Sequence, residues 1–279
     1  MIKTPNQLKA KVRNVSGGNN DIARSYIRLF FMERFLERVA LSKYKSCFVL
    51  KGGMLVSALL GNNSRSTMDI DTTVKALPLT VEEITKIVTE ICLVKVDDNV
   101  TFEVSSVVGI MDEFEYPGIR IQLKGHLGMI SQPFKIDFST DDEITPGAIE
   151  YDYRLMFEER SIEILSYNVE TLLAEKLQTI LVRNITSTRM RDFYDVYSIS
   201  NKVDYSENVL RVAFAATCKK RNTRYNAEEI RLIIDKLRKS VDLAEEWERF
   251  GKKNYYVYEI KWSEVLESSC TLLEKMKTK

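Results

Sequence analysis

The sequence predicts an α/β protein of the α+β type, in which a mixed sheet with helices is followed by a helical region. Up to about residue 165, short runs with alternating or continuous apolar residues are interspersed with helical patterns. From Val169 onward, apolar residues recur almost everywhere at helical spacing. We therefore expect two domains, residues 1–165 and residues 166–279, with the change between residues 140 and 168 as their boundary.

The composition of the 279 residues is that of a folded protein, with 44% hydrophobic and 29% charged residues and a formal net charge of +1. The four cysteines are widely spaced and form no CxxC pair, which argues against a zinc site and favours reduced thiols. No apolar run reaches the ~20 residues that a membrane span needs. We expect a cytoplasmic protein that does not enter the membrane.

The single histidine, His126, restricts the chemistry of any site. Ser-His-Asp or Cys-His hydrolysis would have to use this one residue. A His-rich metal site is excluded, so a metal would be held by carboxylates, which favours Mg²⁺ or Mn²⁺. Because glycines flank His126 at positions 125 and 128, we expect an exposed turn residue.

The first elements are a helix, a strand and a second helix. Residues 20–42 carry apolar side chains at helical spacing, and residues 47–50 predict a short strand. This strand ends at Lys51 and the pair Gly52-Gly53. A helix over residues 54–60 follows, and Gly61-Asn62-Asn63 is expected to end it.

Alternating patterns then predict further strands. Residues 70–74 form the first of them, and a capping-box pattern at Thr80 opens a helix to about Cys92. Three more stretches follow with the order of an antiparallel meander: residues 101–110, 119–125 and 133–138. Turn signals at Tyr116-Pro117-Gly118 and at residues 125–128 separate these three stretches.

The glycine pair and an Asp-x-Asp segment form the first candidate site. Glycines at a strand–helix junction let the backbone approach a phosphate, and free N–H groups at the helix start point at anions. Asp69 and Asp71 lie two positions apart on a strand, so both side chains project to the same side. Their repulsion is relieved by cations, and two Mg²⁺ ions roughly 3.5–4 Å apart would supply two-metal catalysis. The alternative is a strand end with two unrelated acids, but the preceding strand–glycine–helix unit favours a metal site.

A third carboxylate is available on the last strand of the meander. In residues 135–139, Ile136 and Phe138 would point into the core while Lys135 and Asp137 share the opposite face. If this strand pairs beside residues 70–74, Asp137 joins Asp69 and Asp71 as a metal ligand. The alternative is an ordinary alternating strand.

Four segments in order resemble the AbiEii/AbiGii toxin family within the polymerase-β-like nucleotidyltransferases. Gly52-Gly53 with Asp69-Ile70-Asp71 is similar to the first motif, and Lys135 with Asp137 to the second. Lys176 in the segment Leu-Leu-Ala-Glu-Lys-Leu is similar to the third motif, and Arg191-Asp192-Phe193-Tyr194-Asp195 to the fourth. The likeness spans about residues 28–200. Each motif is weak alone, but four in sequence are specific.

The resemblance implies a polymerase-β-like nucleotidyltransferase domain and a toxin of a type IV toxin–antitoxin system that acts in abortive infection against phage. It implies an NTP substrate, transfer of nucleotides to the 3′ end of tRNA, and an antitoxin that is a separate transcriptional repressor and need not bind the toxin. One departure is that many polymerase-β-like enzymes have Gly-Ser where this chain has Gly52-Gly53, so a hydroxyl contact to phosphate is missing.

The expected site residues divide into three sets. The metal ligands are Asp69, Asp71 and Asp137. The catalytic residues are Asp69, Asp71, Asp137, Lys176 and Asp192. The nucleotide-binding residues are Gly52, Gly53, Arg65, Lys135 and Lys176.

The roles of Lys176 and Asp192 can also be argued from their chemistry. Lys176 would reach the triphosphate as a point charge. Asp192 would orient this lysine, accept a proton or contact the nucleotide, with Asp195 as the alternative fourth-motif residue. The alternatives without function are a solvated helix face for Lys176 and a surface ion pair with Arg189 or Arg191 for Asp192.

The helical C-terminal region interleaves basic and aromatic residues, which suits phosphates and unpaired bases. Examples are Lys219-Lys220-Arg221, Arg224-Tyr225 and Lys252-Lys253-Asn254-Tyr255-Tyr256. We expect this region to bind the tRNA acceptor arm, with solvated helix faces as the alternative. Two other functions stay open for the chain: NMP transfer to a protein or small-molecule hydroxyl, and a non-catalytic module that binds NTP.

Overall fold

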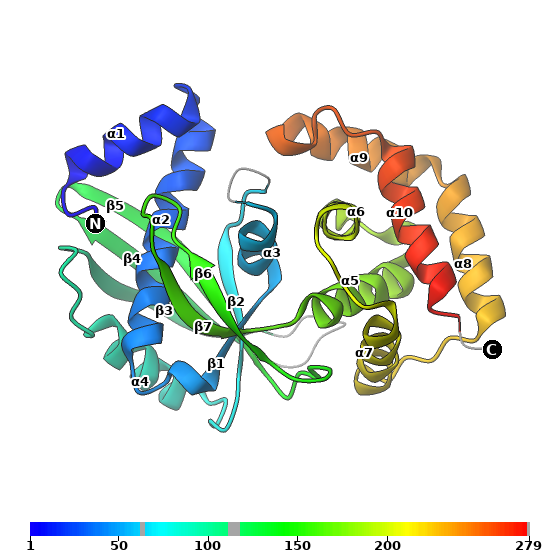
Figure 1. The fold of residues 1–279 in the computed structure, drawn as a ribbon, viewed down its shortest axis with the longest axis horizontal. Coiled ribbons are helices and arrows are strands. Elements are labelled where there is room, and N and C mark those ends of the chain that lie inside the picture. Colours follow the sequence, from blue (N-terminus) through cyan, green and yellow to red (C-terminus); the bar gives the residue numbers. More distant parts are fainter. Residues whose placement is uncertain (62–64, 111–117, 278–279) are drawn as a thin grey trace. The chain divides into compact units, whose positions relative to one another are not determined.

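The computed structural model describes residues 1–61, 65–110 and 118–277 (Figure 1). The chain divides into two compact units. The first unit comprises Met1–Ala58, Ser66–Asp142 and Ile149–Ser166. The second unit comprises Leu59–Arg65, Glu143–Ala148 and Tyr167–Lys279.

A mixed sheet forms the centre of the first unit. Among the described residues it has seven strands in the order β3-β4-β5-β2-β1-β7-β6. Their bounds are Phe48–Lys51 (β1), Asp69–Val74 (β2), Thr101–Ile110 (β3), Gly118–Leu127 (β4), Ile130–Thr140 (β5), Ile149–Arg154 (β6) and Ser161–Ser166 (β7). The pairs β2–β5 and β1–β7 are parallel, and the other neighbours are antiparallel. The predicted α/β class with a mixed sheet is confirmed.

Helices of the first unit accompany this sheet. They are α1 (Pro5–Ser16), α2 (Asn20–Leu41), α3 (Gly52–Leu60, whose last two residues belong to the second unit) and α4 (Val81–Cys92), with a 3₁₀ turn at Lys45–Cys47. The long helix α2 contacts β5 and β7, α4 contacts β3 and β4, and α1 packs against α2. The rings of Phe102 and Phe134 pack edge-on against Phe35 of α2. Gly125 of β4 allows the close approach of Phe31, because a Cβ there would lie 2.4 Å from the Phe31 ring.

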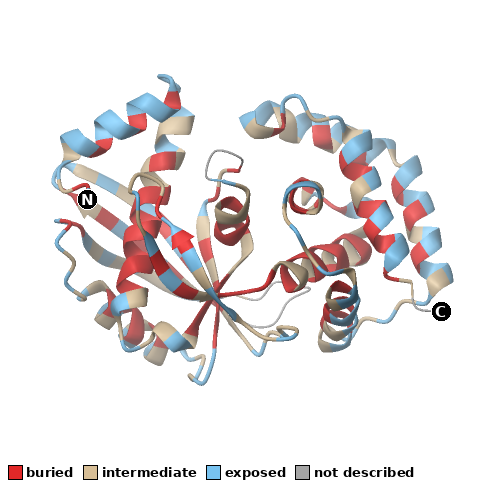
Figure 2. Cartoon of the chain, viewed as in Figure 1, coloured by how far each residue is buried: buried red, intermediate tan, exposed pale blue. Residues whose placement is uncertain are grey.

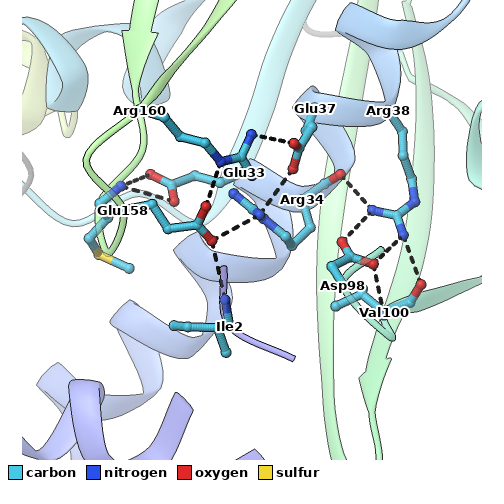
Figure 3. A network of polar contacts seen from close by, with 10 residues as sticks. Ile2, Glu33, Arg34, Glu37, Arg38, Asp98, Val100, Glu158 and Arg160 are labelled. Atoms are coloured by element: carbon cyan, nitrogen blue, oxygen red, sulfur yellow. Dashed lines mark hydrogen bonds and ion pairs between the residues drawn. The ribbon is translucent and has the colours of Figure 1, made fainter. Parts of the chain in front are cut away.

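Helix α2 is buried along much of its length (Figure 2), and its buried residues include the charged Glu33, Arg34, Glu37 and Arg38. Figure 3 shows their partners. Arg38 is 2% exposed and donates to both oxygens of Asp98 at 2.9 Å, and Arg34 lies 3.0 Å from Glu37. We call the charged groups Arg34, Glu37, Arg38, Asp98, Glu158 and Arg160 the buried arginine network.

The second unit is helical. Its helices are α5 (Val169–Arg183), α6 (Met190–Lys202), α7 (Glu207–Lys220), α8 (Ala227–Lys239), α9 (Val241–Lys253) and α10 (Trp262–Lys275), with 3₁₀ turns at Asn184–Thr186 and Tyr255–Val257. Asn168 caps α5 by accepting from the Thr171 N–H, and Asn226 forms a capping box with Glu229 on α8. The apolar stripe that predicted α5 is buried, with Leu173 and Leu177 fully inaccessible.

Several local predictions were wrong or incomplete. Helix α1 and strands β6 and β7 were not predicted from the sequence, and the helix expected from residue 54 begins at Gly52. His126 is not an exposed turn residue: it lies in β4, its side chain is 31% exposed, and the turn comes later at Gly128, where φ is +54°. Of the predicted breaks, Asn62, Asn63, Tyr116 and Pro117 lie outside the described residues. No helix in the described ranges has the length and apolar character needed to cross a membrane.

Candidate active site

The three aspartates meet because β2 and β5 are parallel neighbours. In this pair Asp71 lies directly opposite Asp137, and Asp69 lies opposite Lys135. Ile136 and Phe138 are buried on the other face, as expected from the alternation of β5. One carboxylate oxygen from each of Asp69, Asp71 and Asp137 lies within 4.8 Å of the other two. We call these residues the acidic triad.

The glycine pair lies against one member of this triad. Gly52 has a φ of +62°, and a Cβ at this position would lie 1.9 Å from the Asp71 Oδ2 atom, so a side chain is excluded twice. The Gly53 N–H donates to the same Oδ2 at 3.2 Å. The anion that the N–H group holds in this structure is therefore the carboxylate of Asp71.

The electrostatics of the triad are unbalanced around Asp71. Burial and the neighbouring charge of Asp69 raise the pKa of Asp71 to about 7, against the opposing effects of Lys51 and the Gly53 N–H. The charged form of Asp71 is thus disfavoured when no cation is bound. A cation between the carboxylates would stabilise the charged form.

Two basic residues that the sequence argument missed flank the triad. Arg120 of β4 donates from Nε and Nη2 to the two oxygens of Asp137 at 2.7 and 2.6 Å. Hydrogen bonding to Asp137 raises the pKa of the Arg120 guanidinium. On the other side, the Lys51 ammonium lies 2.6 Å from Asp142. The signal for Arg120 was present in the predicted meander, because the strand over residues 119–125 pairs with the strand that carries Asp137.

The residues of the third and fourth motifs form a cluster in the second unit. Lys176 lies 3.0 Å from Asp192 and 2.6 Å from Asp195, and it is 8% exposed. Arg65 donates to both oxygens of Asp195 at 2.6 and 3.0 Å. Against the effect of burial, Asp195 and Asp192 raise the pKa of Lys176, which stays charged.

This cluster bears on two open points. Both Asp192 and Asp195 contact Lys176, but Asp195 is fully buried whereas the Asp192 side chain is 15% exposed. Among the described residues, Oδ2 of Asp192 is buried without a hydrogen-bond partner. Arg65, expected to bind nucleotide, is 4% exposed and holds Asp195. Lys135, the remaining candidate, is exposed on β5.

The acidic triad fits a hard divalent cation. Its three donors are all carboxylate oxygens on adjacent strands, which are the ligands that Mg²⁺ and Mn²⁺ prefer. Burial and the neighbouring charge of Asp69 both disfavour the charged form of Asp71, and a bound cation would favour it. The arrangement can therefore hold a metal against a phosphate.

Comparisons with known proteins identify the family and the fold. The profile of the nucleotidyl transferase AbiEii toxin family, of type IV toxin–antitoxin systems, matches residues 34–268. A candidate nucleotidyltransferase from H. pylori superposes with a TM-score of 0.51 at 14% identity and covers 88% of this chain and 89% of its own. JHP933 from Helicobacter pylori gives a TM-score of 0.50 at 13% identity, covering 90% and 89%. These two structures show the shared fold, and no curated protein matches the sequence. By its sequence profile, the chain belongs to the AbiEii family of nucleotidyltransferase toxins.

Proposed function

We propose that the protein transfers a nucleotide from an NTP to the 3′ end of tRNA in a metal-dependent reaction, as a toxin in abortive infection against phage. The observation that carries this proposal is the acidic triad on β2 and β5 of a nucleotidyltransferase fold. In the reaction, the 3′-hydroxyl oxygen attacks the α-phosphorus of the NTP. The bond from this phosphorus to the β-phosphate oxygen breaks, pyrophosphate leaves, and the hydroxyl proton passes to solvent.

The proposed roles of the triad follow from its chemistry. Asp69 and Asp71 would hold two Mg²⁺ or Mn²⁺ ions, and Asp137 would be a further ligand of one of them. When bound, these ions neutralise phosphate charge and make the hydroxyl more acidic. Gly52 and Gly53 let the backbone approach Asp71 closely, because they carry no side chain. Lys135 contributes a positive charge on the face of β5 that carries Asp137.

The second unit contributes Lys176 to this proposal. A charged Lys176 would neutralise the triphosphate, and Oδ1 of Asp192 accepts from its ammonium group and orients it. Asp195 and Arg65 are proposed as positioning residues, because their buried ion pair also holds the Lys176 ammonium. We propose Asp192 as the fourth-motif residue, because its side chain is 15% exposed whereas that of Asp195 is fully buried.

A basic hollow in the second unit supports an RNA acceptor. Arg211, Lys219 and Arg224 line a cavity of about 250 Å³ together with Phe214 and Tyr225, and no carboxylate is among its described lining residues. Cations bind phosphates and aromatic rings stack on unpaired bases, each stack contributing roughly 1–3 kcal/mol. Within the expected Lys219-Lys220-Arg221 run, Lys219 is exposed, whereas Arg221 lies 3.2 Å from Glu175. We therefore assign the RNA contact to Lys219 and Arg224.

A labelling experiment tests the activity. Purified protein, Mg²⁺ and total tRNA are incubated with each α-³²P-labelled NTP, beside the Asp69→Ala/Asp71→Ala variant. We expect labelled tRNA from the unchanged protein alone, and none when the 3′-terminal diol has first been oxidised with periodate. Labelling of protein instead would point to a protein acceptor. NTP binding without any labelled product would point to a non-catalytic module.

The acceptor surface has its own test. The variant Lys219→Glu/Arg224→Glu should lose tRNA binding by tenfold or more, since two phosphate contacts are reversed. Arg231→Glu/Lys236→Glu on α8 makes the same charge change at exposed residues outside the hollow and should bind nearly as before. Equal losses in both variants would refute the hollow as the acceptor site.

The antitoxin is the remaining partner. We propose that it is a transcriptional repressor that limits synthesis of this protein and need not bind it. Co-expression of the repressor should restore growth without co-purification. A stable complex of the two proteins would contradict this part of the proposal.

A further inference from the structure

A row of four charged residues crosses the sheet at the acidic triad. Arg120 of β4 lies opposite Asp137 of β5, Asp137 opposite Asp71 of β2, and Asp71 opposite Lys51 of β1. Residues directly opposite each other on neighbouring strands project to the same face. Arg120 therefore shares the face of the triad, although none of the family motifs quoted above includes it.

The guanidinium of Arg120 occupies the oxygens that a metal would use. Both carboxylate oxygens of Asp137 accept from it at 2.7 and 2.6 Å, in the planar two-bond geometry that only arginine offers. The side chains of Arg120 and Asp137 are 33% and 18% exposed, so this pair stays within reach of solvent and of ions. The charge of Arg120 also acts on Asp69 and Asp71.

A metal at the triad and the Arg120 fork compete for Asp137. A divalent cation held by Asp137 would share the two oxygens that already accept from the fork. Two cations a few ångströms apart on one carboxylate also repel strongly, because the half-buried site screens them less than water does. Metal binding at Asp137 therefore weakens the fork.

We propose that Arg120 is the built-in counter-ion of the metal site, which holds Asp137 while no metal is bound and turns to a phosphate of the nucleotide once Asp137 binds metal. This inference rests on the proposed function, because it assumes that the triad binds a metal. While no metal is bound, the positive charge of Arg120 reduces the repulsion among the three carboxylates of the triad. After release, its planar fork matches phosphate oxygens as well as it matches a carboxylate.

The proposal predicts opposite effects on two ligands. In Arg120→Gln, the competing cation is gone but a hydrogen-bond donor remains, so Mn²⁺ alone should bind about tenfold or more tightly. Titrations of Mn²⁺ followed by electron paramagnetic resonance measure this directly. At saturating Mn²⁺, the same variant should bind a non-hydrolysable NTP analogue about tenfold more weakly. If Arg120 had only a structural role, its replacement would weaken the binding of both ligands or of neither.

Control variants make the outcome decisive. Lys124→Gln changes the same charge at an exposed position of the same strand and should alter Mn²⁺ affinity less than about twofold. Arg120→Lys keeps the charge without the fork and should fall between Arg120→Gln and the unchanged protein. Circular dichroism and thermal melting show whether each variant is folded.

Two failures are distinguishable. If folded Arg120→Gln binds Mn²⁺ no better than the unchanged protein, the counter-ion proposal is overturned while the metal site stands. If neither protein binds Mn²⁺, the metal site itself falls, and with it the proposed metal-dependent function.

Discussion

The first unit contains two clusters of charged residues that differ in their charge balance. The buried arginine network around α2 sets three arginines against three carboxylates, with pairs such as Arg34–Glu158 at 3.2 Å and Arg160–Glu158 at 2.6 Å (Figure 3). The acidic triad sets three carboxylates against one fork from Arg120, while Lys51 lies against Asp142. The network is therefore neutral as it stands, and the triad is not.

This difference in charge balance indicates that the network has a structural role and that the triad is a binding site. In the network, every charge has a partner inside the protein, so removing one leaves its partner buried and unpaired. In the triad, burial and then the neighbouring charge of Asp69 raise the pKa of Asp71 to about 7, so removing one of these carboxylates reduces the repulsion between them. Mutations should therefore affect stability at the network and activity at the triad.

The largest effect is expected at the triad. Asp69→Asn or Asp71→Asn should lower the rate of nucleotide transfer on the order of a thousandfold, because each removes a charged metal ligand. Initial rates with labelled NTP and tRNA measure this loss. The thermal midpoint without metal should be unchanged or higher, since repulsion is reduced. Asp152→Asn, at an exposed aspartate on β6, is the matched control, and a comparable loss there would refute the assignment.

The next largest effect is expected in the network and concerns stability alone. Arg38→Met strands Asp98, which is fully buried, and should lower the free energy of unfolding by about 3–5 kcal/mol. Urea denaturation measures this change. Adding Asp98→Asn removes the stranded charge and keeps an acceptor for the Val100 N–H, so the double variant should recover much of the loss. A double variant as unstable as Arg38→Met would contradict the charge argument.

A smaller effect is expected from pH at the triad. Because the folded pKa of Asp71 is about 7 instead of 3.8, Asp71 holds a proton below pH 7 that a metal must displace. The affinity for Mn²⁺ should therefore fall about tenfold for each pH unit below 7 and level off above it. By linkage, the raised pKa also makes the metal-free protein lose stability as pH rises from about 4 to 7. A flat Mn²⁺ affinity between pH 5.5 and 8.5 would contradict this assignment.

The sequence predicted the triad more completely than its surroundings. The alternation of Ile70 and Val74, and of Ile136 and Phe138, places the aspartates on one face of each strand, and local pattern alone contains this information. Which strands are neighbours is decided by packing over long distances in the chain. The predicted meander made the strand of Arg120 a neighbour of the strand of Asp137, but the local pattern does not give the register that places Arg120 opposite Asp137.

The same limit applies to the buried arginine network. In sequence, Glu33, Arg34, Glu37 and Arg38 have the spacing of the solvated face of an amphipathic helix. They are buried because partners from distant segments, Asp98, Glu158 and Arg160, cover that face. No local pattern in α2 reports these partners. Local pattern thus predicts which face a side chain takes, and only tertiary structure shows what covers that face.

The last expected effect concerns Glu33, the carboxyl group of α2 that lies beside the network, and it is confined to one pH range. Burial raises the pKa of Glu33 to about 8, so it is protonated at neutral pH and accepts from the Met156 N–H at 3.0 Å. The unfolded chain ionises this group near its ordinary pKa of 4.5, so folding becomes less favourable as pH rises from 4.5 to 8. Glu33→Gln removes this dependence and keeps the acceptor. Its thermal midpoint should match that of the unchanged protein at about pH 4.5 and exceed it increasingly as pH rises to 8. A variant that is less stable at pH 8 would show that Glu33 is charged in the folded protein and belongs to the network after all.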